Sequence, residues 1–211
     1  DKYGYYAMLL LLRELRTVFR NTGQHKEAIV YYNQWEKKFL ARNDSAGVSI
    51  AANVLSGAYI RMGMLDRGVD YQLKSIAYLN NRQDDYALSD IPPLLGVSGK
   101  VNRYAVLGSV YVKENKPEIA SVYLNEAIRY YHQLREPLLM SDVPYLYLTM
   151  ASCKNLQNND SSLYFFDMAL ELMKMYKSTA LEFAYYYQEK AIYFMRREMM
   201  DSALGSINRT I

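Results

Sequence analysis

Cysteine, histidine and tryptophan are scarce in this chain of 211 residues. It contains one cysteine, Cys153, one tryptophan, and two histidines, His25 and His132. A single cysteine cannot close an internal disulfide, so cysteine usage does not indicate the compartment. Neither histidine is spaced against Cys153 or a carboxylate as a metal site requires, and no phosphate-binding glycine loop is present. We therefore expect no enzyme, no metal site and no cofactor.

A strong charge bias and long apolar runs are also missing. The chain has 25 Lys and Arg against 22 Asp and Glu, a net charge of +3 without a basic block, which gives no basis for nucleic-acid binding. Its longest aliphatic run, residues 7–12, is well short of the ~20 apolar residues that cross a membrane. No signal peptide is visible. Because 51% of the residues are hydrophobic, the chain can nevertheless bury a large core.

An internal repeat runs through the chain five times. Each copy has an aromatic residue or cysteine, a turn residue four positions later and a small residue five positions after that. These positions hold Phe19, Gly23 and Ala28; Tyr59, Gly63 and Gly68; Tyr111, Asn115 and Ala120; Cys153, Gln157 and Ser162; and Phe194, Glu198 and Ala203. Glycine and asparagine tolerate the left-handed backbone that ends a helix. The pattern therefore predicts two helices joined by a tight turn, packed closely at the small residue.

The third copy resembles the tetratricopeptide repeat, a helix-turn-helix unit of about 34 residues. The resemblance rests on residues at the family's spacing, namely Tyr104, Leu107, Gly108, Tyr111, Ala120, Leu124 and Ala127. It implies an all-α fold, a right-handed superhelical solenoid of about five helix pairs in one domain. We expect the repeats to span approximately residues 5–42, 45–82, 89–135, 141–177 and 179–211.

Residues that favour helix starts agree with these boundaries. Ser45 precedes the second repeat, Ser141 and Asp142 open the fourth, and Thr179 with Glu182 predicts a capping box for the fifth. We expect Pro117 in the first turn of a helix, where its missing N–H is harmless. Residues 83–100 fall in a longer interval between the second and third repeats. That interval is open to three interpretations: an extension of the third repeat's first helix, a short separate helix, or a long loop.

Tyrosine is the most unusual feature of the composition, with 22 residues. Stacked tyrosines can form platforms for peptides, sugars or single-stranded nucleic acid. However, Tyr59, Tyr104 and Tyr111 fall at packing positions of the repeat. We therefore interpret most of the tyrosines as packing residues within and between repeats.

The family resemblance implies a concave face lined by the first helix of each pair. On that basis the candidate partner-binding residues are Arg13, Thr17, Arg20, Asn53, Arg61, Asn102, Ser109, Lys113, Tyr147, Lys154, Gln188 and Arg196. One basic residue lies near the end of each of these helices. Cations there favour the helix dipole, which would explain them without a ligand. Alternatively, they attract an acidic peptide or a chain carboxylate.

These features predict a protein- or peptide-binding module without nucleic-acid binding or a membrane span of its own. Because the array resembles those of bacterial sensor histidine kinases and transcriptional regulators, we expect the sensing or regulatory segment of a larger signal-transduction protein. It would be periplasmic in a membrane-anchored sensor and cytoplasmic otherwise. The alternative is a structural scaffold or assembly adaptor without signalling output.

The two ends of the sequence support a further expectation. The chain begins at Asp1 without a methionine and ends at Ile211 inside an apolar helical pattern, so we expect it to be a piece of a longer protein. The residues Ala203, Leu204, Ile207 and Ile211 form an apolar stripe at helical spacing. We expect a further helix to cover this stripe in the longer protein, and self-association or fraying in the present chain.

Overall fold

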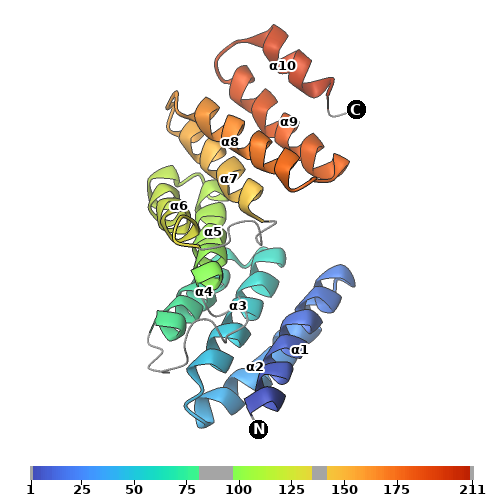
Figure 1. The fold of residues 1–211 in the computed structure, drawn as a ribbon, viewed down its shortest axis with the longest axis vertical. Coiled ribbons are helices and arrows are strands. Elements are labelled where there is room, and N and C mark those ends of the chain that lie inside the picture. Colours follow the sequence, from blue (N-terminus) through green and yellow to red (C-terminus); the bar gives the residue numbers. More distant parts are fainter. Residues whose placement is uncertain (1, 81–96, 135–141, 210–211) are drawn as a thin grey trace. The chain divides into compact units, whose positions relative to one another are not determined.

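A computed structural model describes residues 2–80, 97–134 and 142–209 (Figure 1). In this part of the chain the regular secondary structure is helical throughout, which confirms the all-α prediction. The helices are α1 (Lys2–Asn21), α2 (His25–Ala41), α3 (Ser45–Arg61), α4 (Leu65–Asn80), α5 (Val97–Lys113), α6 (Pro117–Tyr131), α7 (Val143–Leu156), α8 (Ser162–Met175), α9 (Ala180–Met195) and α10 (Met200–Ile207). Of residues 83–100, only the last four are described, and they are helical.

The helices pack in adjacent pairs. The pairs α1 with α2, α3 with α4, α7 with α8, and α9 with α10 are in contact, and α2 also packs on α3, α6 on α7, and α8 on α9. The chain falls into two compact units, residues 1–110 and 111–211, which we call unit 1 and unit 2. Each has its own buried core. We describe each unit by itself.

The predicted turn residues have the expected backbone in four of the five repeats. Gly23, Gly63, Asn115 and Glu198 have positive φ angles. In each of these turns the next residue donates its backbone N–H to the carbonyl five positions earlier, as from Met64 to Tyr59 at 3.0 Å. Such bonds satisfy carbonyl groups that the end of a helix leaves without partners.

The fourth turn differs from the prediction by one residue. Asn158 has the positive φ, at 53°, whereas the predicted Gln157 has a φ of −82°. The short side chain of asparagine makes this backbone more accessible than glutamine does. Asn159 donates to the carbonyl of Lys154 at 2.9 Å, so Lys154, not Cys153, corresponds to the aromatic position. Helix α7 therefore runs one residue out of the predicted register.

The helix starts follow the sequence closely, with one correction. Thr179 and Glu182 form the predicted capping box, and Pro117 is the first residue of α6. Helix α3, however, is capped by Asp44 and not by Ser45. The Asp44 carboxylate accepts a hydrogen bond from the backbone N–H of Gly47 at 2.9 Å and another from the Tyr5 hydroxyl at 2.6 Å. This cap links α1 to the start of α3.

The small residues of the repeat are buried, as the pattern predicts. Gly68 shows why: a Cβ added there would lie 2.5 Å from Cγ1 of Ile60 on the preceding helix. Aromatic packing fills the rest of the cores. In unit 2 the Phe166 ring lies edge-on to Tyr186 and Tyr193, with ring centroids 5.9 and 5.8 Å apart. These two tyrosines are therefore packing residues, in line with the sequence interpretation.

Candidate functional site

Three arginines of unit 1 lie in the C-terminal halves of α1 and α3. Arg16 and Arg20 lie one turn apart on α1, and Arg61 is the last residue of α3. Partial burial lowers the pKa of Arg61, and the positive charges of Arg20 and Arg16 lower it further. The charges of Arg16 and Arg20 thus act on the guanidinium group of Arg61. We call Arg16, Arg20 and Arg61 the arginine cluster.

Gly57 gives Arg61 its position. The Arg61 guanidinium folds back along α3, and its Nη1 donates to the carbonyl oxygen of Gly57 at 3.0 Å. A Cβ added at Gly57 would lie 3.1 Å from Nη1 of Arg61, which is closer than an ordinary van der Waals contact. The glycine therefore lets a cation lie directly against the helix backbone. A residue with a side chain in place of Gly57 would push the Arg61 guanidinium away from the helix backbone.

Asn53 adds a polar group one turn before Gly57 on α3. Its Oδ1 accepts a hydrogen bond from Nε2 of the buried Gln72 at 3.3 Å. This contact orients the Asn53 amide with its NH2 group turned from Gln72, and Asn53 is half-buried. Thr17 is also half-buried on α1, and Arg20 is exposed, with Nε donating to Oδ1 of Asn21 at 3.3 Å.

A fourth arginine, Arg103 of α5, is buried in unit 1 and was not predicted as a functional residue. Its Nε and Nη2 donate to the hydroxyls of Ser75 and Ser49 at 2.6 and 3.1 Å, and Nη1 donates to the Gly99 carbonyl at 3.0 Å. Burial lowers the pKa of Arg103 to about 10, and the charge of Arg16 contributes to the shift. The positive charges of Arg16 and Arg103 therefore act on one another. The repeat spacing carries no signal for Arg103, since buried arginines are rare.

The remaining predicted residues of unit 1 are less informative. Arg13 lies on α1, but its side chain is outside the described set. Asn102 is half-buried on α5. Ser109 is half-buried too, and its hydroxyl donates to the carbonyl of Val106 at 2.8 Å, so it is used within its own helix.

The predicted residues of unit 2 do not form a comparable cluster. Lys113, Gln188 and Arg196 are exposed, and Lys154 donates to Oε1 of Gln157 at 3.3 Å. Tyr147 is buried, with 3% of its side chain exposed, and belongs to the core. Burial raises the pKa of Tyr147 to about 12.

The basic residues also differ in their position relative to the turn. Arg61, Lys113 and Arg196 lie two residues before the left-handed residue, whereas Arg20 lies three and Lys154 four residues before it. Each residue along an α-helix turns by 100°. The five predicted cations therefore do not all share one face of their helices. Of the arginine cluster, Arg20 and Arg61 belong to the predicted residues, whereas Arg16 does not.

Arg197 was not among the residues predicted from the repeat, but it makes more contacts than the predicted Arg196 beside it. Its Nη1 donates to Oδ1 of Asn155 at 3.0 Å, its Nη2 lies 3.6 Å from Asp160, and its guanidinium lies 3.9 Å from the centre of the Tyr193 ring. These contacts tie the end of α9 to the turn after α7. We interpret Arg197 as structural.

Two cavities lie away from the predicted residues. An open cleft of about 420 Å³ on unit 1 is lined by α1 and α2, including Phe19, Lys26 and Tyr31. A cavity of about 320 Å³ in unit 2 lies among α8, α9 and α10 and is lined in part by Lys190 and Arg209. Lys190 is already engaged, since its Nζ donates to the Tyr186 hydroxyl at 3.1 Å.

The described residues include no cluster of three or more His, Cys, Asp or Glu side chains that could hold a metal ion. The search for membrane-crossing helices, covering the same part of the chain, found none of sufficient length and apolar character. Cys153 is buried, and its Sγ–H donates to the Pro117 carbonyl at 3.2 Å. Burial raises the pKa of the Cys153 thiol to about 11, so it is a poor nucleophile near neutral pH.

The chain was also compared with known proteins. No protein-family model matches it, and no curated protein was found that is similar to it.

Proposed function

We propose that this chain is a protein- or peptide-binding module of the tetratricopeptide-repeat type. In unit 1, the arginine cluster binds an acidic segment of the partner. The observation that carries the proposal is the position of Arg61 at the end of α3, where its Nη1 donates to the carbonyl oxygen of Gly57 at 3.0 Å. The lowered pKa of Arg61, caused by partial burial and then by the charges of Arg20 and Arg16, supports it. Three cations held close together repel one another, and a bound anion relieves that repulsion.

A carboxylate suits the chemistry of this surface. Guanidinium groups bind carboxylates with paired, charge-assisted hydrogen bonds. Arg61 is held against Gly57, which reduces the side-chain freedom that binding would otherwise remove. Exposed ion pairs contribute ~0.2–1 kcal/mol each, so binding through the cluster alone is weak and decreases as salt increases.

The role in the cell is proposed by analogy with the family. Repeat arrays of this type occur in bacterial signalling proteins, and we propose that this chain is the sensing or regulatory segment of such a protein. A structural scaffold or assembly adaptor without signalling output is the alternative. The exposed apolar residues Leu204 and Ile207 on α10 favour that alternative, because they offer a contact surface without charge.

The test compares a charge-reversed cluster with a matched control. The probe is a fluorescein-labelled hexaglutamate peptide, and binding is followed by fluorescence anisotropy at low salt. We expect the wild-type chain to bind the peptide, and Arg20→Glu with Arg61→Glu to weaken binding by about 10-fold or more. The control, Lys37→Glu with Arg42→Glu, makes the same change in net charge at exposed positions on α2 and just after it.

Three outcomes would contradict the proposal. The wild-type chain could fail to bind hexaglutamate at low salt, or the control could lose as much affinity as the cluster variant. A hexaglutamine peptide that bound equally well would remove the electrostatic explanation. Circular dichroism of each variant checks that the helices remain folded.

A further inference from the structure

Two tyrosines of unit 2 lie together at the surface between α7 and α9. Tyr145 of α7 and Tyr185 of α9 have ring centroids 6.2 Å apart, with an angle of 34° between the ring planes. The two residues are 36% and 44% exposed. Helices α7 and α9 contact each other, so this surface is formed between two helices of the same unit. We call Tyr145 and Tyr185 the tyrosine pair.

Exposure distinguishes the tyrosine pair from the core tyrosines of the same helix. Tyr186 and Tyr193 of α9 are 0% and 3% exposed and pack on the ring of Phe166. Packing accounts for those two residues, whereas the rings of the tyrosine pair also reach solvent. The faces of an aromatic ring carry partial negative charge, so exposed rings attract cations.

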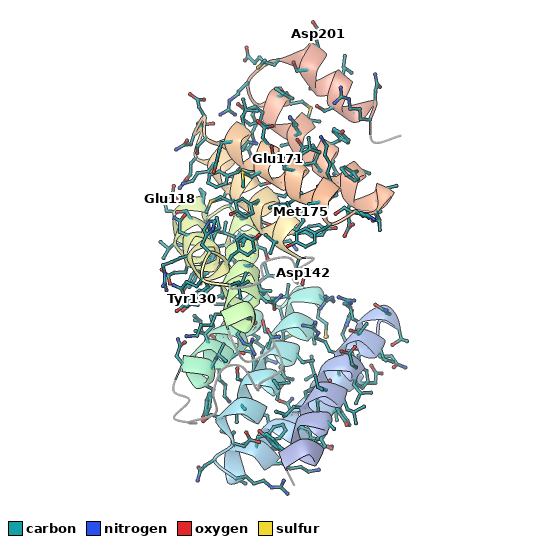
Figure 2. All side chains as sticks on the ribbon, viewed as in Figure 1. Glu118, Tyr130, Asp142, Glu171, Met175 and Asp201 are labelled. Atoms are coloured by element: carbon teal, nitrogen blue, oxygen red, sulfur yellow. The ribbon has the colours of Figure 1, made fainter. Side chains whose placement is uncertain are left out.

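Three carboxylates surround the tyrosine pair. Asp142 lies three residues before Tyr145, at the start of α7 (Figure 2). Glu182 and Glu189 lie one helical turn to either side of Tyr185 on α9. Burial raises the pKa of Tyr145, and the nearby Glu182 and Asp142 raise it further. Burial and then Glu189 raise the pKa of Tyr185. The carboxylates therefore act on both hydroxyls of the tyrosine pair.

The hydrogen bonds to these carboxylates come from neutral groups. Glu182 accepts one from the backbone N–H of Thr179 at 2.6 Å, within the capping box of α9. Glu189 accepts one from the Ser152 hydroxyl at 2.6 Å. Asp142 is exposed, and its side chain makes no capping hydrogen bond to α7. Neutral donors leave the charge of a carboxylate in place, and each carboxylate can accept several hydrogen bonds.

We propose that the tyrosine pair, with Asp142, Glu182 and Glu189, binds a basic segment of a partner protein through an arginine side chain. A guanidinium group stacks on aromatic faces and donates paired hydrogen bonds to carboxylates, so it matches both parts of this surface. A lysine ammonium has the same charge but lacks the planar shape. Lysine therefore binds less tightly than arginine.

This surface is independent of the arginine cluster. The cluster lies in unit 1 and attracts an acidic segment, whereas the tyrosine pair lies in unit 2 and attracts a basic one. Either proposal can therefore fail without the other. The net charge of the chain, +3, opposes the binding of a polycation, so a basic peptide binds only where the local charge is negative.

The test uses a fluorescein-labelled hexaarginine peptide and fluorescence anisotropy at low salt. We expect the wild-type chain to bind it, and Asp142→Asn with Glu189→Gln to weaken binding by about 5-fold or more, because two negative charges are removed with little change in size. Glu182 stays unchanged because it caps α9. Tyr185→Leu should weaken binding by about 3-fold, since it removes an aromatic ring and keeps an apolar side chain. Hexalysine should bind the wild-type chain less tightly than hexaarginine.

The matched control is Glu171→Gln with Asp201→Asn. It removes the same charge at exposed positions on α8 and α10, and both residues are labelled in Figure 2. This control should bind hexaarginine like the wild-type chain, and circular dichroism checks the helices of every variant. A wild-type chain that does not bind hexaarginine at low salt overturns the proposal, as does a control that loses as much affinity as the Asp142 and Glu189 variant. Unchanged affinity in Tyr185→Leu would overturn the role of the tyrosine pair.

Discussion

At Gly47, α3 meets α2 with no side chain between them. A Cβ at this position would lie 2.6 Å from Cε1 of Phe39 and closer still to two other atoms of its ring. Phe39 is buried and lies against Trp35, with ring centroids 5.5 Å apart, so the ring cannot easily move away. The glycine is thus required by space, and its φ angle is an ordinary helical one.

We expect Gly47→Ala to lower the free energy of unfolding by about 1–3 kcal/mol through overpacking, measured by urea denaturation. Gly205 is the matched control, because it is also inside a helix but has nothing within 4 Å of an added Cβ. There Ala should stabilise the protein by up to about 1 kcal/mol, the difference in helix propensity. Equal effects from the two substitutions would show that packing at Gly47 is not the cause.

Single residues differ in how far the sequence reveals them. The burial of Ala120 follows from the repeat, since it holds the small-residue position, and the structure confirms it. Cys153 is buried too, although the shifted turn removes it from the aromatic position. Gly47 lies outside the repeated positions, and its close contact depends on the neighbouring ring of Phe39. Arg103 cannot be found from the pattern either, because its partners are hydroxyls on α3 and α4 that only folding brings together.

At the scale of elements, the turns show where the backbone is strained. Lys177 and Glu198 have φ angles of 53° and 57°, although neither is glycine or asparagine. For a residue with a Cβ this conformation costs about 1–2 kcal/mol. At the turn position of the repeat, glycine follows α1 and α3, whereas Glu198 follows α9. Lys177 lies after α8, outside the repeated turn positions.

We expect Lys177→Gly and Glu198→Gly each to raise stability by about 1 kcal/mol, since glycine adopts positive φ without this cost. Thermal unfolding measures the effect. Lys174→Gly, at an exposed position inside α8, is the control and should destabilise by about 1 kcal/mol. If all three glycine substitutions changed the stability by the same amount, the left-handed backbone would not be the cause of the stabilisation.

The elements were more predictable than the candidate site. Helical periodicity indicates where α7 lies, but a turn one residue longer or shorter leaves the periodicity almost unchanged. The resulting shift explains why Tyr147 was placed on a binding face. It lies eleven residues before the turn, as Tyr104 does, and Tyr104 is a packing residue of the third repeat. In unit 1 the left-handed residues are the predicted Gly23 and Gly63, and the charge of Arg20 contributes to lowering the pKa of Arg61.

Arg16 illustrates a different limit. It lies three residues before Phe19, the position that Gly108 holds before Tyr111 in the third repeat, and it was not among the predicted residues. In the structure its charge influences both Arg61 and Arg103. The sequence could predict that cations gather near the ends of first helices. Which of them share a surface depends on how α1 and α3 pack, and spacing along the chain does not contain that information.

At the scale of the whole molecule, contacts are made mainly between helices that are close in the sequence. The core of unit 1 is built from α1 to α4, and that of unit 2 mainly from α7 to α9. In proteins with this kind of packing, stability is approximately the sum of local terms and nearest-neighbour contacts. A perturbation in one core should therefore weaken that core first.

Gly47→Ala provides the test, because its clash lies between α2 and α3. We expect amide hydrogen exchange in this variant to accelerate in α1 to α4 and to stay unchanged in α7 to α9, measured by mass spectrometry of peptides. The reason is that the strained ring of Phe39 belongs to the core of unit 1, which is separate from that of unit 2. Equal acceleration in both sets of helices would mean that the two units open together, so that their coupling exceeds the stability of either core.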